Sequence, residues 1–286
     1  MTAARLIVTA DTPAWAAVAG QTTTGFATSV IACDAEAGVE RTLGPAETPD
    51  GRPGVSILMF AFSRDGLEKA IANRVGQCVM TCATTACYNG LPLGEKTISV
   101  GGKLRYFGDG WQISKRIGGR RYWRIPVMDG EFLCEETFGT VKGVAGGNII
   151  LMGTEPAATL VAAESAVAAM RRCPDVILPF PGGMARSGSK VGSKYKTLRA
   201  STNTAYAPTL RGVVATEMPP DVRCAYEVVI DGLTLDAVER ATAAGLRAAR
   251  RHEESITLVT SGNYGGKLGP FHIRLHDVLN RYAEPD

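Results

Sequence analysis

The first half of the chain alternates short apolar runs with amphipathic stretches, a pattern that predicts strands separated by helices. The expected strands are rich in apolar and β-branched residues and span 5–9, 26–33, 55–62 and 77–81. Thr12 and Pro13 supply the N-cap and the first-turn proline that start a helix after the first strand. The expected order is therefore β-α-β followed by a second β-α-β.

The second helix of this half is expected to start at Asp65, with Glu68 as its partner in a capping box. Leu67, Ile71 and Val75 recur four residues apart, which places them on one face of that helix. This face predicts packing of the helix against the sheet.

The second half of the chain repeats the same order. Strands are expected at 148–152, 176–180, 223–230 and 255–260. Glu155-Pro156 opens one helix and Thr234 opens the other. The residues expected to face inward are Leu160, Ala163, Val167 and Met170, then Leu235, Val238, Thr242, Gly245 and Ala249. Such repeated units are typical of split ferredoxin-like folds, so we expect an α+β protein with two ferredoxin-like lobes.

Residues 95–142 have a different texture, with short runs rich in Tyr, Trp, Ile and Val. Turn signals separate these runs at Gly108-Asp109-Gly110, Gly118-Gly119 and Asp129-Gly130, which predicts an inserted β-meander. The expected N-terminal lobe is 1–145, including this insertion, and the C-terminal lobe is 146–286. Two roles for the insertion stay open: an oligomer contact or a wall of the active site.

The amino-acid composition indicates the class of protein to which the chain belongs. The chain has 286 residues, of which 45% are hydrophobic and 21% charged, enough for a globular protein with a real core. No apolar run approaches the roughly 20 residues that span a bilayer, and the start lacks the pattern of a signal peptide. We therefore expect no membrane association and a cytoplasmic protein.

The charge balance argues against nucleic acid as a partner, because 31 basic residues face 28 acidic ones and the net charge is only +3. Two local basic clusters exist. Residues 115–124 hold one, which is interpreted as solvated charge at strand edges. The other, Lys190, Lys194 and Lys196, lies in a glycine-rich loop and favours an anionic ligand.

No metal site is expected. Cys78, Cys82 and Cys87 have the spacing C-x3-C-x4-C, but no further ligand at a standard spacing supports a site, so buried thiols are favoured. The total of seven cysteines in a chain without an export signal argues against disulfides. His272 and His276 lie in a segment that alternates like a strand, where two histidines four apart do not form a helical metal pair.

Glycine-rich loops are the remaining carriers of chemistry. They span 143–148, 179–195, 200–206 and 261–269, whereas a phosphate loop, a dinucleotide fingerprint and a nucleophile elbow are all missing. Such loops allow backbone amides to face a ligand, although flexible surface loops have the same composition. The candidate binding residues are Gly146, Gly147, Asn148, Ser189, Lys190, Lys194, Asn203, Asn263 and Lys267. The lysines suit carboxylates or a phosphate.

Glu227 lies inside the expected strand at 223–230, among residues typical of a strand core. Strand alternation alone favours a solvent-facing side chain at this position. The alternative is a partly buried carboxyl with a raised pKa, which would suit a general acid/base.

The loop sequences resemble one enzyme family closely, the formylmethanofuran–tetrahydromethanopterin formyltransferases. The similar segments include TGFATSVIAC (24–33), ETPDGRPGV (47–55), GQCVMT (76–81), GVAGGN (143–148), PFPGG (179–183), SKVGSK (189–194) and GNYGGKLG (262–269). The resemblance runs from about residue 5 to residue 279. It implies two α+β lobes related by a pseudo-two-fold and no prosthetic group. It also implies methanofuran and tetrahydromethanopterin, or its dephospho form, as substrates.

The resemblance also assigns roles. The family's catalytic glutamate lies in a C-x-Y-E motif, which here ends at Glu227, so the resemblance reverses the solvent-facing interpretation. Glu227 would take a proton from the pterin amine and return it to the leaving amine. Loop amides or Asn203 would stabilise the oxyanion, and the lysines would hold the glutamyl carboxylates of methanofuran.

The implied partners are further copies of the chain or the subunits of a bacterial formyltransferase/hydrolase complex. Two other functions compete with catalysis. A catalytically inactive structural subunit of that complex is the alternative, although Glu227 and the glycine loops are present. An RNA-binding ferredoxin-like protein would need exposed aromatic residues on its strands, a pattern that 55–62 and 223–230 lack.

Overall fold

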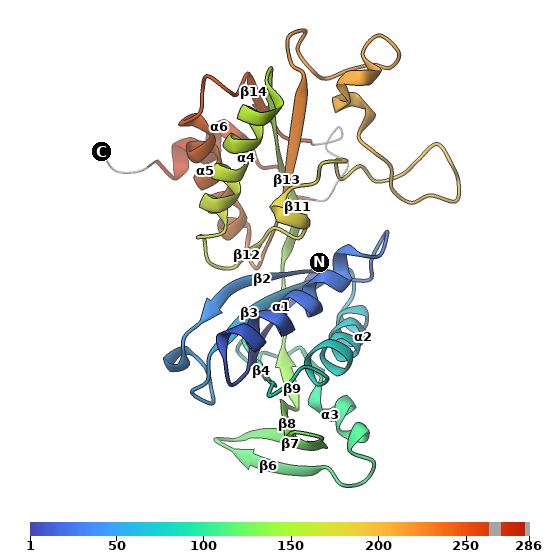
Figure 1. The fold of residues 1–286 in the computed structure, drawn as a ribbon, viewed down its shortest axis with the longest axis vertical. Coiled ribbons are helices and arrows are strands. Elements are labelled where there is room, and N and C mark those ends of the chain that lie inside the picture. Colours follow the sequence, from blue (N-terminus) through green and yellow to red (C-terminus); the bar gives the residue numbers. More distant parts are fainter. Residues whose placement is uncertain (263–269, 284–286) are drawn as a thin grey trace. The chain divides into compact units, whose positions relative to one another are not determined.

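The structure is a computed structural model that describes residues 1–262 and 270–283. The chain divides into two compact units, Met1–Gly143 and Val144–Asp286. Both mix helices and strands, so the expected α+β class is confirmed (Figure 1). None of the helices in the described part of the chain has the length and hydropathy to cross a bilayer.

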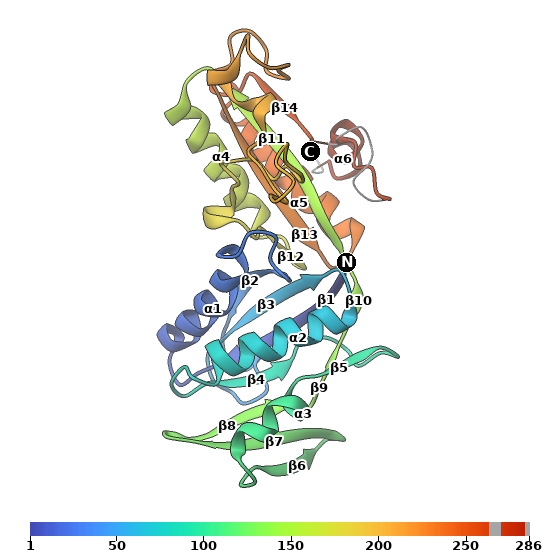
Figure 2. The same cartoon turned by 90° about the vertical axis from the view of Figure 1, so that its right-hand side faces the viewer.

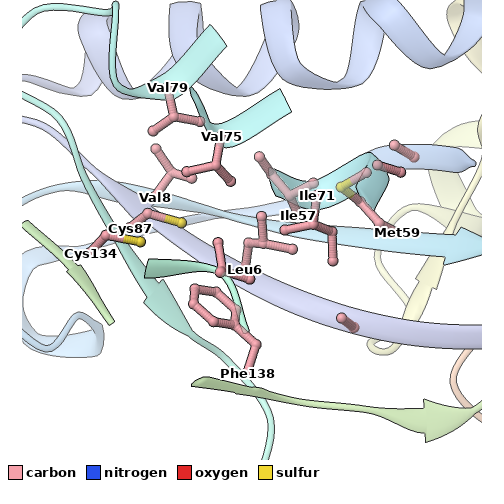
Figure 3. Packing of buried hydrophobic residues seen from close by; sticks show 14 of the residues in the cluster. Leu6, Val8, Ile57, Met59, Ile71, Val75, Val79, Cys87, Cys134 and Phe138 are labelled. Carbon is pink, nitrogen blue, oxygen red and sulfur yellow. The ribbon is translucent and has the colours of Figure 1, made fainter. Parts of the chain in front are cut away.

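The first unit is built on four antiparallel strands, β1 (Thr2–Thr9), β2 (Glu36–Leu43), β3 (Gly54–Ala61) and β4 (Ala86–Asn89), in the spatial order β2-β3-β1-β4. Helices α1 (Pro13–Thr28) and α2 (Arg64–Arg74) lie side by side on one face of this sheet (Figure 2). Their apolar faces and the inward residues of the strands form one core (Figure 3).

The helix starts predicted for this unit are confirmed at α1 and only in part at α2. The Thr12 side chain accepts a hydrogen bond from the Trp15 amide at 3.3 Å, as the N-cap prediction requires. The expected capping box at α2 is wrong, because Ser63 is the N-cap and Glu68 accepts from the Ser99 amide instead. The predicted stripe of Leu67, Ile71 and Val75 is confirmed, since all three side chains are fully buried.

Two segments expected as strands are helical. Residues 26–33 contain the end of α1 and the turn after it, because Ala19, Thr23 and Ala27 recur every four residues and are buried. Residues 77–81 continue α2 through the π-turn η2 (Val75–Val79), whose first and last side chains are buried. In both places packing of a helical face overrides the β propensity of the local sequence.

The insertion extends the same sheet. Strands β6 (Ile113–Ile117), β7 (Arg120–Val127) and β8 (Gly130–Glu135) form the expected antiparallel meander, and β8 joins β4 in parallel. A helical stretch is an addition to the expected pattern: α3 (Gly101–Leu104) and the 3-10 turn η3 (Arg105–Gly108) precede β6. The short strands β5 (Thr97–Ser99) and β9 (Thr137–Gly139) pair with each other, and β10 (Val141–Lys142) pairs with β1.

The second unit repeats this strand order. Its strands are β11 (Val144–Gly153), β12 (Val176–Ile177), β13 (Cys224–Gly232) and β14 (Leu258–Thr260), arranged β12-β13-β11-β14 and all antiparallel. In chain order this is second-third-first-fourth, as in the first unit. Helices α4 (Pro156–Met170) and α5 (Leu235–Arg250) supply the apolar faces of its core, and α6 (Leu275–Arg281) follows.

The remaining helical turns are the 3-10 turns η1 (Pro45–Glu47), η4 (Pro181–Gly183), η5 (Thr204–Tyr206) and η6 (Pro208–Leu210). Strand β12 is shorter than expected, because Pro179 and Pro181 cannot donate to a ladder. The strand expected around His272 and His276 is wrong, since α6 begins at Leu275.

Replacement of Phe138 by alanine should destabilise the first unit by about 3–5 kcal/mol, because its fully buried ring would leave a cavity in the core. The matched control is Phe62→Ala, whose ring is 87% exposed and whose loss should cost less than about 0.5 kcal/mol. Urea unfolding followed by circular dichroism measures both. Equal destabilisation by the two variants would contradict the assigned core.

Candidate active site

Glu227 lies on β13 with its side chain on the face of the sheet away from the helices. Val228 and Ile230 occupy the alternate positions of the strand, and both belong to the core formed with α4 and α5. The opposite face is not open to solvent, because Met218 and Val222 of the long 178–223 segment pack there on Ile150. Glu227 is therefore only 4% exposed. The solvent-facing interpretation is wrong, although strand alternation itself holds.

Three hydrogen-bond donors converge on the Glu227 carboxylate. The Asn148 side-chain amide donates to Oε1 at 2.6 Å, and the Ser189 hydroxyl donates to the same oxygen at 2.6 Å. The Ser189 backbone amide donates to Oε2 at 2.6 Å. Asn148 is oriented in turn, because its Oδ1 accepts from the Gly262 amide at 2.9 Å. Glu227 thus accepts hydrogen bonds through both carboxylate oxygens, and these bonds fix the orientation of its side chain.

The segment that supplies Ser189 is fixed to β13 by its backbone. The Ala185 amide donates to the Glu227 carbonyl at 2.8 Å, and the Asn203 amide donates to the Ser187 carbonyl at 2.8 Å. Gly188, between them, has φ +75°, and a Cβ there would lie 2.5 Å from the Asn203 Cβ. Only glycine fits this approach, so Gly188 sets how closely the segment crosses the carboxylate.

A pocket opens beside Glu227. It holds about 270 Å³ of empty space, including space open to solvent, and is lined by Ile150, Ala185, Arg186, Ser187, Gly188, Asn203, Tyr206, Ala225 and Glu227. Six of these nine residues come from the 178–223 segment, and the other three come from β11 and β13.

Of the nine residues that line the pocket, the sequence predicted only Asn203 and Glu227. Arg186 and Tyr206 are among those that it missed. Burial raises the pKa of the Tyr206 hydroxyl, and the charges of Glu217 and Glu227 raise it further. The phenol is thus protonated at neutral pH and can donate a hydrogen bond. Tyr206 lies three residues after Asn203, in the 200–206 loop, which was grouped with the glycine-rich loops although it contains no glycine.

The predicted binding residues separate into two groups. Asn148, Ser189 and Asn203 surround Glu227 and its pocket. The Gly146 amide donates to Asp231 Oδ1 at 2.8 Å, and a Cβ on Gly147 would lie 2.8 Å from Val238, so both glycines serve the packing of β11.

The predicted lysines do not line the pocket. Lys190 is half-buried, while Lys194 is exposed, with its Nζ 5.7 Å from the centre of the Tyr195 ring. Asn263 and Lys267 lie outside the described residues. Within 1–262 and 270–283, no cluster of three or more His, Cys, Asp or Glu side chains could hold a metal ion.

Family models match both parts of the chain. The model described as formylmethanofuran-tetrahydromethanopterin formyltransferase matches residues 1–127, and the model of the proximal lobe of the same family matches residues 130–278. The chain belongs to this formyltransferase family. The formylmethanofuran–tetrahydromethanopterin formyltransferase of Methylococcus capsulatus is 57% identical, over 98% of this chain and 94% of that protein.

Two solved structures resemble this formyltransferase over nearly its whole length. The formyltransferase/hydrolase complex from Methylorubrum extorquens, solved with methylofuran, contains a chain that is 50% identical with a TM-score of 0.91. The match covers 97% of this chain and 92% of that one. The formyltransferase from Methanosarcina barkeri is 45% identical with a TM-score of 0.89, covering 97% and 94% of the two chains.

Replacement of Gly188 by alanine should lower the rate of formyl transfer by about a hundredfold, because the new Cβ would push Ser189 and Asn203 away from Glu227. Gly192→Ala is the matched control. Gly192 has φ +88° with no atom near its Cβ position, so it carries the same backbone strain of about 1–2 kcal/mol without displacing the site. Thermal unfolding and steady-state kinetics separate strain from displacement. A similar loss of rate in both variants would contradict the role of Gly188.

Proposed function

We propose that this chain transfers a formyl group between formylmethanofuran and tetrahydromethanopterin in a ternary complex, with Glu227 as the acid/base. Membership of the formyltransferase family supports the activity. The assignment of the site rests on a nearly buried carboxylate, which accepts hydrogen bonds from three donors at the wall of a pocket. No prosthetic group takes part in this chemistry, and both coenzymes are substrates.

The reaction needs one proton to leave and one to return. The pterin amine attacks the formyl carbon, a new N–C bond forms, and the carbonyl electron pair moves to oxygen. Glu227 takes the proton that the attacking nitrogen loses. The oxyanion then re-forms the carbonyl, the bond to the methanofuran nitrogen breaks, and Glu227 returns the proton to that nitrogen. The two proton transfers balance in either direction, which suits a reversible transfer.

The neighbours of Glu227 have separate tasks in this scheme. Asn148 and Ser189 orient the carboxylate, since they donate to both of its oxygens. Asn203 and Tyr206 line the same pocket and are the candidate donors for the oxyanion, an effect worth about 3 kcal/mol per donor. Alignment of two bound coenzymes contributes the rest of the rate.

The outer part of the substrate site is also a proposal. Lys190 and Lys194 follow Ser189 along the chain and would bind the glutamyl carboxylates of methanofuran. Asn263 and Lys267 would complete the set of residues that bind the coenzymes, with tetrahydromethanopterin or its dephospho form as acceptor. Gly146 and Gly147 would act indirectly in this scheme, through the shape that they give to β11.

Both units are assigned to the ferredoxin-like fold, because each has the order β-α-β-β-α-β and the same antiparallel strand arrangement. We propose that a pseudo-two-fold relates the lobes, with 1–145 and 146–286 as the two domains. The partners would be further copies of the chain or subunits of a hydrolase complex, in the cytoplasm. One relative, 51% identical, is itself a subunit of the formyltransferase/hydrolase complex of Methylorubrum extorquens.

The variant Glu227→Gln should lower kcat for formyl transfer by about 10²–10⁴-fold with little change in KM, because glutamine keeps the shape but cannot take the proton. Glu253→Gln, at an exposed position of the same unit, is the control and should keep its activity. Transfer is followed with purified formylmethanofuran and tetrahydromethanopterin. Equal rates for Glu227→Gln and the unmodified chain would remove Glu227 from the mechanism. No transfer by the unmodified chain would favour the inactive structural subunit.

Loss of an oxyanion donor should reduce kcat by about 10²–10³-fold while KM stays nearly constant. Asn203→Ala and Tyr206→Phe test the two candidates separately, and Tyr195→Phe, 61% exposed in the same segment, is the control for the hydroxyl. Single-turnover kinetics measure the chemical step directly. An effect confined to KM in either variant would reassign that residue to binding.

A further inference from the structure

Strand β6 is an exposed edge of the sheet in the first unit. All five of its residues, Ile113 to Ile117, are exposed, so neither of its faces is covered. Within the part of the chain that the structure describes, β6 pairs with β7 alone and ends the strand order. One backbone edge of β6 therefore has no described strand beside it. Proteins usually protect such edges, because a free edge pairs readily with another extended chain.

The turn after β6 identifies which backbone groups face outward. Gly118 (φ +56°) and Gly119 (φ +80°) form a two-residue turn with both glycines left-handed, as in a type I′ hairpin. In such a hairpin the residues next to the turn, Ile117 and Arg120, are a hydrogen-bonded pair, and the pattern alternates along the strand. The amides and carbonyls of Ser114 and Arg116 therefore point to the free edge.

Charge on the meander is neutralised on β7 but not on β6. The β7 arginines each meet an acid on or just after the next strand: Arg120–Glu135 at 3.4 Å, Arg121–Glu136 at 3.3 Å and Arg124–Glu131 at 2.5 Å. Lys115 and Arg116 make no ion pair with any residue in the described ranges. An acidic strand paired with the free edge of β6 would supply carboxylate partners to Lys115 and Arg116, as β8 and the residue after it do for the β7 arginines.

Apolar and charged side chains alternate in a defined pattern on the two faces of β6. Ile113, Lys115 and Ile117 share one face of β6 by alternation, and both isoleucines are 56% exposed. Ser114 and Arg116 share the other face. A complementary strand would thus carry apolar, acidic and apolar side chains on one face and an acidic side chain on the other.

We propose that β6 is a docking site for an acidic extended segment of a different protein, which adds to the sheet as a further strand. Pairing with a second copy of this chain fits less well. Two β6 strands related by a two-fold at Lys115 would place the two Lys115 side chains opposite each other, and like charges opposite one another destabilise a sheet. The proposal does not depend on formyl transfer, because β6 contributes nothing to the Glu227 pocket.

The test uses the full chain and a synthetic peptide, acetyl-Thr-Val-Glu-Glu-Glu-Val-Thr-amide, which matches the pattern in either direction. Its lysine counterpart, with lysine in place of each glutamate, is the control peptide. The acidic peptide should bind at least about tenfold more tightly than the control, and added salt should weaken it. Hydrogen exchange should slow at the amides of Ser114 and Arg116. Equal binding of both peptides, or no binding, would overturn the proposal.

Two variants locate the binding on β6. Ser114→Pro removes one outward amide and blocks the edge without touching the ladder to β7, so it should weaken binding by more than about tenfold, whereas Ser114→Ala should not. The double change Lys115→Glu and Arg116→Glu should also abolish preference for the acidic peptide, and it remains informative if the proline variant fails to fold. Unchanged binding in the double variant would overturn the charge argument. A dimer in sedimentation that Ser114→Pro dissolves would assign the edge to a second copy instead.

Discussion

The burial of one carboxylate organises the second unit. A charged group that is 4% exposed would be strongly destabilising without hydrogen bonds to replace those of water. Asn148 on β11 and Ser189 in the long segment supply those bonds, so the charge ties a strand and an irregular segment to the same point of β13. The segment stays over the sheet because its departure would leave the carboxylate without two of its hydrogen-bond donors. The pocket lies where the segment covers the sheet. The proposed chemistry therefore depends on the same contacts that stabilise the buried charge.

The first unit contains an instructive counterpart. Glu40 on β2 is also nearly buried and also accepts from a serine hydroxyl, that of Ser56 at 2.6 Å. The Arg5 guanidinium also donates to both of its oxygens, at 2.8 and 2.7 Å. An arginine beside a carboxylate stabilises the charged form. The donors to Glu227 are an amide, a hydroxyl and a backbone N–H, all neutral. The same strand arrangement therefore holds one nearly buried carboxylate with an ion pair and the other with neutral donors.

The helix starts and buried helix faces of this fold could be predicted from the sequence, whereas the packing of the distant 178–223 segment over β13 could not. Thr12 and Pro13 start α1, and the stripe of Leu67, Ile71 and Val75 is buried, because caps and periodicity are local physics. Residues 26–33 and 77–81 were wrongly predicted as strands. Their sequences are compatible with either a helix or a strand, and tertiary packing stabilises the helix. For Glu227, alternation predicted the correct face and the wrong environment. Residues 185–189 of the irregular segment cross the carboxylate, and Met218 and Val222 pack on the same face of the sheet. No pattern in an irregular segment predicts where it will pack.

The face of a sheet and the edge of a sheet pose different problems, and this chain meets one in each of its two units. At β13 the face that carries Glu227 is covered by the 178–223 segment, which leaves a pocket beside the carboxylate. At β6 the edge has exposed isoleucines and cations that pair with no acid in the described residues. Such cations protect an edge against neutral or basic strands, whereas an acidic strand would neutralise them. The meander neutralises its other arginines strand by strand, so the open charge on Lys115 and Arg116 is not a general property of the insertion. An edge that is charged with one sign and apolar between the charges discriminates among partners, because it repels its own copy while attracting an acidic strand.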